Sequence, residues 1–223
     1  MRLAVFASGG GSNFQAIVEA SRKGDLDADV ALCVTNNPQA GVLQRADALG
    51  VKAEQIEPDG ATARKSEPIH KLLTRNDVTH IALAGYLKKI PATLISAYSG
   101  RIVNIHPALL PCFGGKGMYG ANVHQAVIES GVQWTGVTVH FVDETYDTGP
   151  ILLQHAVGVH PADTAESLAK RVLWFEHRVY PAALQLLAEN RVITSNKRVQ
   201  ITGSRPHFPL YEPDSPQDFP TSS

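Results

Sequence analysis

The residues best suited to chemistry are an asparagine and a histidine two positions apart, Asn104 and His106. They end an apolar segment, residues 101–105, that is predicted to be a strand, so both side chains point to the same side. An amide donates hydrogen bonds, and an imidazole gains or loses a proton near neutral pH. Open α/β sheets bind ligands at the carboxyl ends of their strands, so we predict a ligand site here. The alternative is a buried pair that only binds loop carbonyls.

Asp147, in an acidic turn at residues 143–150, is the acid predicted to pair with His106. A neighbouring carboxylate orients an imidazole and raises its pKa, so that the ring can carry a proton. Asn104 is predicted to stabilise a developing oxyanion, a role worth roughly 3–4 kcal/mol. With no activated Ser or Cys in the set, the expected reaction is direct attack of a substrate nucleophile on a carbonyl. Asp143 and Glu144 compete for the acid's role, and a solvated turn is the alternative for all three.

A glycine-rich turn, residues 8–13, follows the apolar segment 3–7. It precedes a predicted helix, and the backbone N–H groups of such a helix start form a phosphate site. The turn lacks the Lys-Ser/Thr pair of a Walker A loop, and Phe14 stands where a dinucleotide fingerprint needs glycine. We predict phosphate binding, with a simple tight turn between strand and helix as the alternative.

The elements that must position these residues alternate between strand and helix. Strands are predicted at 3–7, 28–35, 51–56, 80–84 and 101–105, and the intervening helices include 40–49, 62–76 and 91–98. This alternation predicts parallel strands with right-handed crossovers. After a glycine-rich loop at 112–121 and a helix at 122–130, the strands 135–142 and 151–159 are predicted to form an antiparallel edge. In the first of these strands the side chains alternate, with Val137, Val139 and Phe141 on one face and Thr138 and His140 on the other. The fold class is therefore α/β, a single Rossmann-like open twisted sheet, mostly parallel with antiparallel C-terminal edge strands, and helices on both faces.

The last long helix is predicted to begin at a capping box made by Asp163 and Glu166. Its apolar stripe holds Leu168, Val172, Phe175 and Val179, and Pro181 is expected to kink or restart it. One or two strands are predicted within 191–202. We predict one domain, 1–203, with a phosphate-binding N-terminal half and a catalytic C-terminal half, and an extended or disordered Pro-rich tail at 204–223.

Composition narrows the class of protein. The 223 residues are 43% hydrophobic and 18% charged with a net charge of −1, which is typical of a globular chain with a sizeable core. The charge favours neither a nucleic-acid nor a membrane partner. Cys33 and Cys112 do not form a disulfide framework, so a cytoplasmic location is expected. The histidines show no metal-binding spacing, so no metal is predicted.

With these residues assembled, the chain resembles the phosphoribosylglycinamide formyltransferases, folate-dependent enzymes of purine synthesis. The match extends from the N-terminus to about Ile193. The segments that carry it are residues 8–13, 83–86, 104–111, 136–142 and 147–150, in this order. The resemblance implies formyl transfer from 10-formyltetrahydrofolate to the amino group of glycinamide ribonucleotide, by a monomer or weak homodimer.

The resemblance also implies roles for individual residues. Asn104, His106 and Asp147 match the family's catalytic trio. The other matches are the phosphate loop at Gly11, Ser12 and Asn13, the ribose-binding Glu176, and the folate site at Arg64, Leu87, Lys88, Lys89, Ile90, Asn104, Asp143 and Asp147.

One departure from the family pattern and one ambiguous match bear on these roles. Some members carry a phosphate-binding lysine where this chain has Leu173, and Lys116, Lys170 or Arg171 are the candidate replacements. Lys65 competes with Arg64 for the folate position. The alternative functions are a formyltetrahydrofolate hydrolase, which carries an extra N-terminal domain, and a nucleotide-binding module without chemistry.

Overall fold

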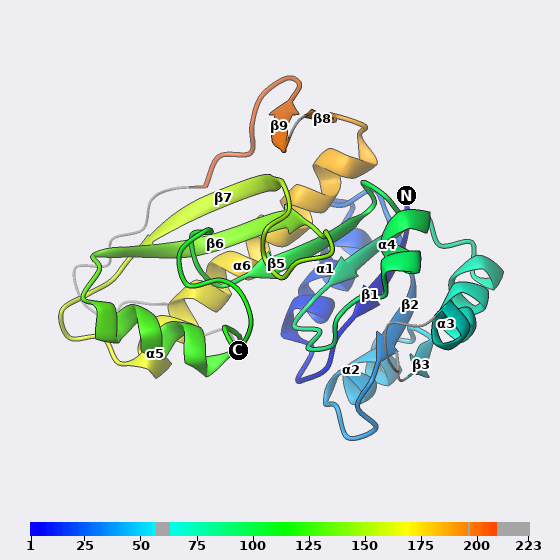
Figure 1. The fold of residues 1–223 in the computed structure, drawn as a ribbon, viewed down its shortest axis with the longest axis horizontal. Helices are drawn as coiled ribbons and strands as arrows, with labels where there is room; N and C mark the ends of the chain where they lie inside the picture. Colours follow the sequence, from blue (N-terminus) through cyan, green and yellow to red (C-terminus); the bar gives the residue numbers. More distant parts are fainter. Residues whose placement is uncertain (57–62, 196, 209–223) are drawn as a thin grey trace.

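The computed structural model describes residues 1–56, 63–195 and 197–208, with only the backbone described at residues 63–67. Its centre is a seven-stranded sheet in the order β3-β2-β1-β4-β5-β6-β7 (Figure 1). The strands are β1 (Arg2–Phe6), β2 (Asp29–Thr35), β3 (Ala53–Gln55), β4 (His80–Leu83), β5 (Ile102–His106), β6 (Trp134–Phe141) and β7 (Ile151–Gly158).

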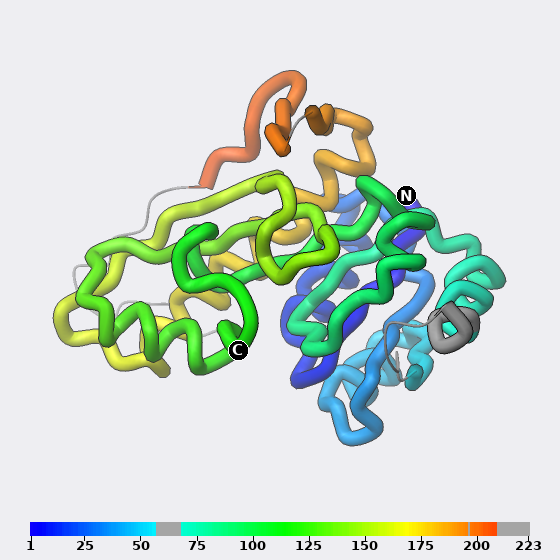
Figure 2. Tube along the Cα trace, viewed as in Figure 1, coloured from blue at the N-terminus to red at the C-terminus, as the bar shows by residue number. Residues whose placement is uncertain are grey.

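The sheet has a parallel part and an antiparallel part. β3, β2, β1, β4 and β5 are parallel, whereas β6 is antiparallel to both β5 and β7. The N-terminal parallel half and the later antiparallel half lie at opposite sides of the molecule (Figure 2). The predicted fold class is therefore confirmed, and the predicted strands differ from the observed ones by at most two residues at either end.

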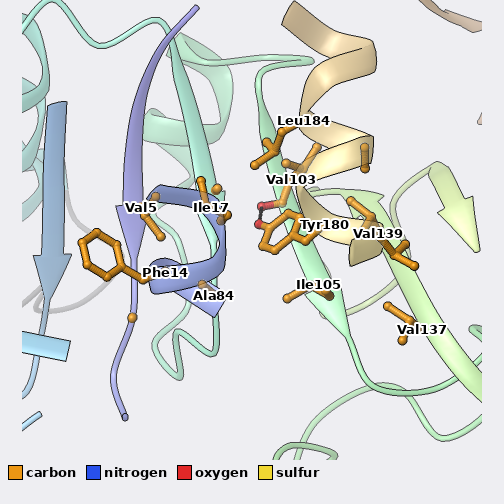
Figure 3. Packing of buried hydrophobic residues seen from close by; sticks show 14 of the residues in the cluster. Val5, Phe14, Ile17, Ala84, Val103, Ile105, Val137, Val139, Tyr180 and Leu184 are labelled. Atoms are coloured by element: carbon orange, nitrogen blue, oxygen red, sulfur yellow. Dashed lines mark hydrogen bonds between the residues drawn. The ribbon is translucent and has the colours of Figure 1, made fainter. Parts of the chain in front are cut away.

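Within the described residues, six helices cover the two faces of the sheet. They are α1 (Ser12–Lys23), α2 (Val42–Ala48), α3 (Ala63–Arg75), α4 (Ala92–Ala97), α5 (Ala121–Ser130) and α6 (Ala165–Ala188). Alternate residues of β1 separate the two cores, because Leu3 and Val5 pack with α1, α5 and α6, whereas Ala4 and Phe6 pack with α3 and α4. Figure 3 shows the first of these cores, in which α6 lies against β5 and β6.

The same alternation fixes which side chains of β5 and β6 can reach a ligand. Val103 and Ile105 of β5 belong to the α6 core together with Val137, Val139 and Phe141 of β6, as the alternation of β6 predicted. Asn104 and His106 therefore point to the opposite face. The helices of that face, α3 and α4, pack on β1, β2, β4 and the first residue of β5, Ile102, so the carboxyl end of β5 is left to loops.

The predicted capping box of α6 is wrong, and of the two outcomes predicted for Pro181, a kink or a restart, the restart is wrong. Its N-cap is Thr164, which forms the capping box with Ser167, because the Asp163 carboxylate is engaged in a buried ion pair with Arg171 at 2.6 Å. Pro181 does not restart the helix, which is continuous through residue 188. Most of this helix is buried between the other helices and the sheet, and that packing offsets the one backbone hydrogen bond that proline cannot make.

The chain after α6 forms the small antiparallel pair β8 (Val192–Ser195) and β9 (Arg198–Ile201), as predicted. The segment that follows returns to the main sheet, where the Phe208 ring lies 5.7 Å from that of His155 on β7. The rest of the predicted tail, from residue 209, lies outside the described residues.

Candidate active site

A cavity of about 1050 Å³ lies at the carboxyl ends of β1, β4 and β5. Its walls come from the segment after β4, the glycine-rich loop before α5, the turn at 142–147 and one side of α6. Asn104, His106 and Asp147 all line it. The site predicted at this edge of the sheet is thus a real concave space, large enough for a small ligand.

His106, at the end of β5, is buried beside this cavity. Its Nε2 lies 2.8 Å from the backbone carbonyl of Phe113, and its Nδ1 lies 3.8 Å from Oδ2 of Asp147. Because a carbonyl only accepts hydrogen bonds, Nε2 carries a hydrogen. In the neutral ring Nδ1 is therefore the basic nitrogen, and it faces the carboxylate.

Asp147 is held by the loop that closes the site. Its backbone adopts the left-handed conformation (φ 57°), which aspartate tolerates better than most residues. Its Oδ2 accepts the backbone N–H of Gly115 at 2.8 Å, and its Oδ1 lies 3.5 Å from Nε2 of His140. The predicted pairing of Asp147 with His106 is present, but the carboxylate serves two histidines.

Asp147 raises the pKa of His106, as predicted, but the net shift of this pKa is downward. Burial lowers the pKa of His106 below 6.5, and His140 adds to this, while Asp147 and the Phe113 carbonyl oppose it. For Asp147, burial favours a higher pKa, but the nearby His140, the hydrogen bond from the Gly115 N–H and the nearby His106 bring it below 3.8. At neutral pH the pair is thus a neutral imidazole beside a carboxylate.

His140 is the site residue that the sequence reasoning missed. It stands opposite Asn104 in the β5–β6 ladder, and its Nε2 accepts a hydrogen bond from Asn104 Nδ2 at 3.1 Å. Its Nδ1 donates to the carbonyl of Phe141 at 2.9 Å. The only signal in the sequence was its position in the alternation of the strand, which places it on the face of Asn104 once the antiparallel register is known.

Two networks hold the ends of the strands at the site. Thr138 on β6 donates to the carbonyl of Ala108 at 2.6 Å and accepts the N–H of Leu110 at 3.1 Å, which fixes the loop after His106. Tyr180, fully buried on α6, points at β5, where its hydroxyl lies 3.1 Å from the Val103 carbonyl (Figure 3). The same hydroxyl lies 2.9 Å from the Leu83 carbonyl on β4.

The predicted phosphate loop forms the start of α1. Gly11 is the N-cap and has φ 80°, and a Cβ there would lie 2.5 Å from the Val42 side chain, so this position requires glycine. Gly9 and Asn13 line the cavity, whereas Gly11 and Ser12 do not. The loop therefore adjoins the cavity mainly through its first glycine and Asn13.

Asn13 and Glu176 meet across the cavity wall, although they are far apart in the sequence. Asn13 Nδ2 donates to Oε2 of Glu176 at 2.6 Å. Burial raises the pKa of Glu176, and Asn13 opposes that rise. The Oδ1 atom of Asn13 is buried without a hydrogen-bond partner among the described residues. The pair thus offers unused hydrogen-bonding capacity at this end of the cavity.

Seven of the eight residues predicted to bind folate line the same cavity, namely Leu87, Lys88, Lys89 and Ile90 from one segment, and Asn104, Asp143 and Asp147. The segment is fixed by Ser8, whose hydroxyl accepts the N–H of Leu87 at 2.9 Å and whose N–H donates to the Gly85 carbonyl. The side chains of Arg64 and Lys65 lie outside the described residues.

Leu173 lines the cavity, and of the three candidate cations that could replace a lysine there, Lys116 is the one that also lines it among the described residues. Lys170 is paired with Glu166 at 2.8 Å on the surface, and Arg171 is committed to Asp163. Lys116, which is exposed in the glycine-rich loop, is therefore the candidate that the structure leaves.

Three further observations, on metal binding, membrane-spanning helices and cysteines, concern the described ranges alone. They contain no group of three or more His, Cys, Asp and Glu side chains placed to hold a metal ion. Their helices include none with the length and apolar character needed to span a bilayer. Cys33 is buried and Cys112 is exposed, and both are free.

A family model described as "Formyl transferase" matches residues 1–184. The chain therefore belongs to the formyl transferase family.

The relatives that the chain matches include phosphoribosylglycinamide formyltransferases. The one from Bacillus subtilis is 42% identical over 192 residues, which cover 85% of this chain and 96% of that protein. The chloroplastic one from Vigna unguiculata is 48% identical over 210 residues, which cover 92% of this chain. The matched region spans 66% of the length of that protein.

A solved structure gives the same result. Glycinamide ribonucleotide transformylase 1 from Symbiobacterium toebii matches with a TM-score of 0.83 and 38% identity, over 90% of this chain and 93% of that one. The resemblance and the enzyme class predicted from the sequence are confirmed. The hydrolase and the non-catalytic nucleotide module are not favoured by these relatives.

Proposed function

We propose that this protein transfers a formyl group from 10-formyltetrahydrofolate to the amino group of glycinamide ribonucleotide, a step of purine synthesis. The observation that carries the proposal is the juxtaposition of Asn104, His106 and Asp147 on the wall of one cavity that is also lined by the acidic Glu176 and by the apolar, lysine-containing segment 87–90. The named activities of the relatives support the same reaction.

The two ends of the cavity fit the two substrates. Glu176 and Asn13 can bind vicinal hydroxyls, and the N-terminus of α1 at Gly11, Ser12 and Asn13 favours an anion such as a phosphate. At the other end Leu87 and Ile90 are apolar, and the exposed backbone there and Asp143 can pair with the polar edge of a pterin. The co-substrate supplies the formyl group, and the chain supplies binding, orientation and proton transfer.

The geometry suggests how the chain promotes the transfer. One amide hydrogen of Asn104 is used by His140, and the second is available to stabilise negative charge that develops on the formyl oxygen. Neutral His106 takes the proton of the attacking amine at Nδ1 and returns it to the departing folate nitrogen. Asp147, next to Nδ1, stabilises the imidazolium while it exists. The cation is thus formed during the reaction, rather than present in the free enzyme.

We further propose that the enzyme works in a reducing compartment such as the cytoplasm, since both cysteines are free. As partners we propose only its two small-molecule substrates, in a monomer or weak homodimer without nucleic acid, membrane or metal. Residues 1–203 are the proposed catalytic domain.

The test is to mix the purified protein with 10-formyltetrahydrofolate and to follow the absorbance change on deformylation, with and without glycinamide ribonucleotide. We expect signal only with the ribonucleotide. Equal signal without it would identify a hydrolase. Binding of the ribonucleotide with no turnover and no folate binding would identify a nucleotide-binding module.

A further inference from the structure

His124, on α5, is a buried histidine that the proposed mechanism does not use. It is 6% exposed and lines the cavity together with His106. Its Nδ1 is buried and has no hydrogen-bond partner among the described residues. A buried polar atom without a partner destabilises a fold, so a position that keeps one calls for a reason beyond packing.

The surroundings of His124 indicate which ligand it meets. α5 packs on α6, the helix that brings Glu176 and Leu173 to the cavity. His124, His106 and Glu176 line the same cavity. His124 thus shares this wall with His106, where the reaction is proposed to occur, and with Glu176, where the ribose is proposed to bind. The short amide chain of an acceptor substrate must lie between these two positions.

We propose that His124 is a substrate-binding residue that hydrogen-bonds the glycinamide part of the acceptor and so aims its amine at the formyl group. Nδ1 is enclosed by protein, so Nε2 is the nitrogen that reaches the ligand. This inference rests on the proposed function and adds to it a residue that contacts the acceptor.

The environment keeps this ring suited to the task. Burial, reinforced by the charge of His106, lowers the pKa of His124 to about 4. His124 therefore remains a neutral hydrogen-bonding group while His106 gains and loses its proton. Two histidines that line one cavity thus have different roles, because His106 lies beside the Asp147 carboxylate, whereas the described residues place no ion-pairing carboxylate beside His124.

The test compares three variants at position 124 with one control. His124→Phe fills the space but removes both nitrogens, whereas Gln and Asn place an amide near the positions of Nε2 and Nδ1 respectively. His155→Phe is the matched control, because His155 is equally buried, also has an unpartnered ring nitrogen, and does not line the cavity.

We expect His124→Phe to reduce kcat/KM for the ribonucleotide by about 10- to 100-fold, in the range for loss of one or two buried hydrogen bonds. Its thermal midpoint should equal or exceed that of the wild type, and its Kd for the folate should be unchanged. His124→Gln should recover more activity than His124→Asn, and His155→Phe should match the wild type in activity.

His124→Phe with wild-type kcat/KM, or Gln and Asn variants that are equally active at the wild-type level, would overturn the inference. So would a loss that falls equally on folate and ribonucleotide binding. Absence of transfer by the wild type under the same conditions would instead contradict the proposed function itself, so the two failures are distinguishable.

Discussion

Asn104 on β5 donates a side-chain hydrogen bond to Nε2 of His140 on β6, the residue directly opposite it across the antiparallel junction of the sheet. Because the backbone carbonyl of Phe141 accepts from the other ring nitrogen, His140 fixes which way the Asn104 amide points. One hydrogen of the Asn104 amide is bonded to His140, and the pairing of β5 with β6 fixes the direction of the second. Such preorganisation is what makes a hydrogen-bond donor effective toward a developing oxyanion.

Replacing Asn104 by Ala should therefore lower kcat by about 10²- to 10³-fold, the loss observed when one such donor is removed. The Kd values of both substrates should change much less, because the donor acts on charge that develops only during the reaction. Steady-state kinetics together with equilibrium binding would show this. A large rise in Kd with unchanged kcat would assign Asn104 to substrate binding instead.

Replacing His106 by Ala should lower kcat by at least about 10²- to 10⁴-fold, because the reaction would lose its proton acceptor. The fold should persist, since the residue lies at the end of β5 beside a cavity and not in either apolar core. Circular dichroism and folate binding serve as the controls. Turnover near that of the wild type would rule out the assigned role.

Asp147→Asn should change the pH dependence of the reaction. Burial already places the pKa of His106 below 6.5, and the carboxylate opposes that shift, so its removal lowers the pKa further. As neutral His106 is the acceptor, kcat/KM should decline only below this pKa. The acid limb of the pH profile should then move to lower pH in the variant, while the plateau drops because the imidazolium is no longer stabilised. An acid limb displaced to higher pH would contradict this account.

Glu176→Gln tests the ribose end of the cavity. The variant keeps the size of the side chain but removes the charged acceptor that Asn13 contacts at 2.6 Å. We expect Kd for the ribonucleotide to rise by about 10- to 100-fold, as for the loss of hydrogen bonds to a charged group. Calorimetric titration with each substrate provides the comparison. Weaker folate binding with unaltered ribonucleotide binding would show that the two ends were assigned in reverse.

Tyr180→Phe tests the support beneath the site. The hydroxyl is buried within hydrogen-bonding distance of the Leu83 and Val103 carbonyls, so its loss should reduce the free energy of unfolding by about 1–3 kcal/mol. Tyr98→Phe is the matched control, because its hydroxyl bonds the Val78 carbonyl at 3.2 Å in the other core. Denaturant unfolding measures both. Only Tyr180→Phe should also lower kcat. If Tyr180→Phe and Tyr98→Phe had identical effects on activity, the proposal that Tyr180 supports the site through β4 and β5 would be refuted.

The sequence predicted the parts of this protein that depend on local pattern. The apolar runs, glycine turns and alternation of β6 were sufficient for the sheet, its faces and the location of Asn104 and His106. Asp147 was found because acidic turns are conspicuous in sequence, and the structure indeed places it beside His106.

The errors arose where distant segments meet. The role of His140 depends on the register of β5 with β6, which no local pattern specifies. The low pKa of His106 depends on how deeply the loops bury it, and the carbonyl that fixes its tautomer comes from Phe113 in a loop with no periodic signal. The capping box was misplaced by one residue because the partner of Asp163, Arg171, lies two turns further along α6.

The most direct test of the central claim is the identity of the product. Folded protein would be incubated with glycinamide ribonucleotide and 10-formyltetrahydrofolate labelled with carbon-13 in the formyl group, and the products would be separated and analysed by mass spectrometry. The account predicts that the label appears on the ribonucleotide amine, with one tetrahydrofolate released for each labelled product and almost none with His106→Ala. Label recovered only as formate, or no transfer by protein that binds both substrates, would contradict it.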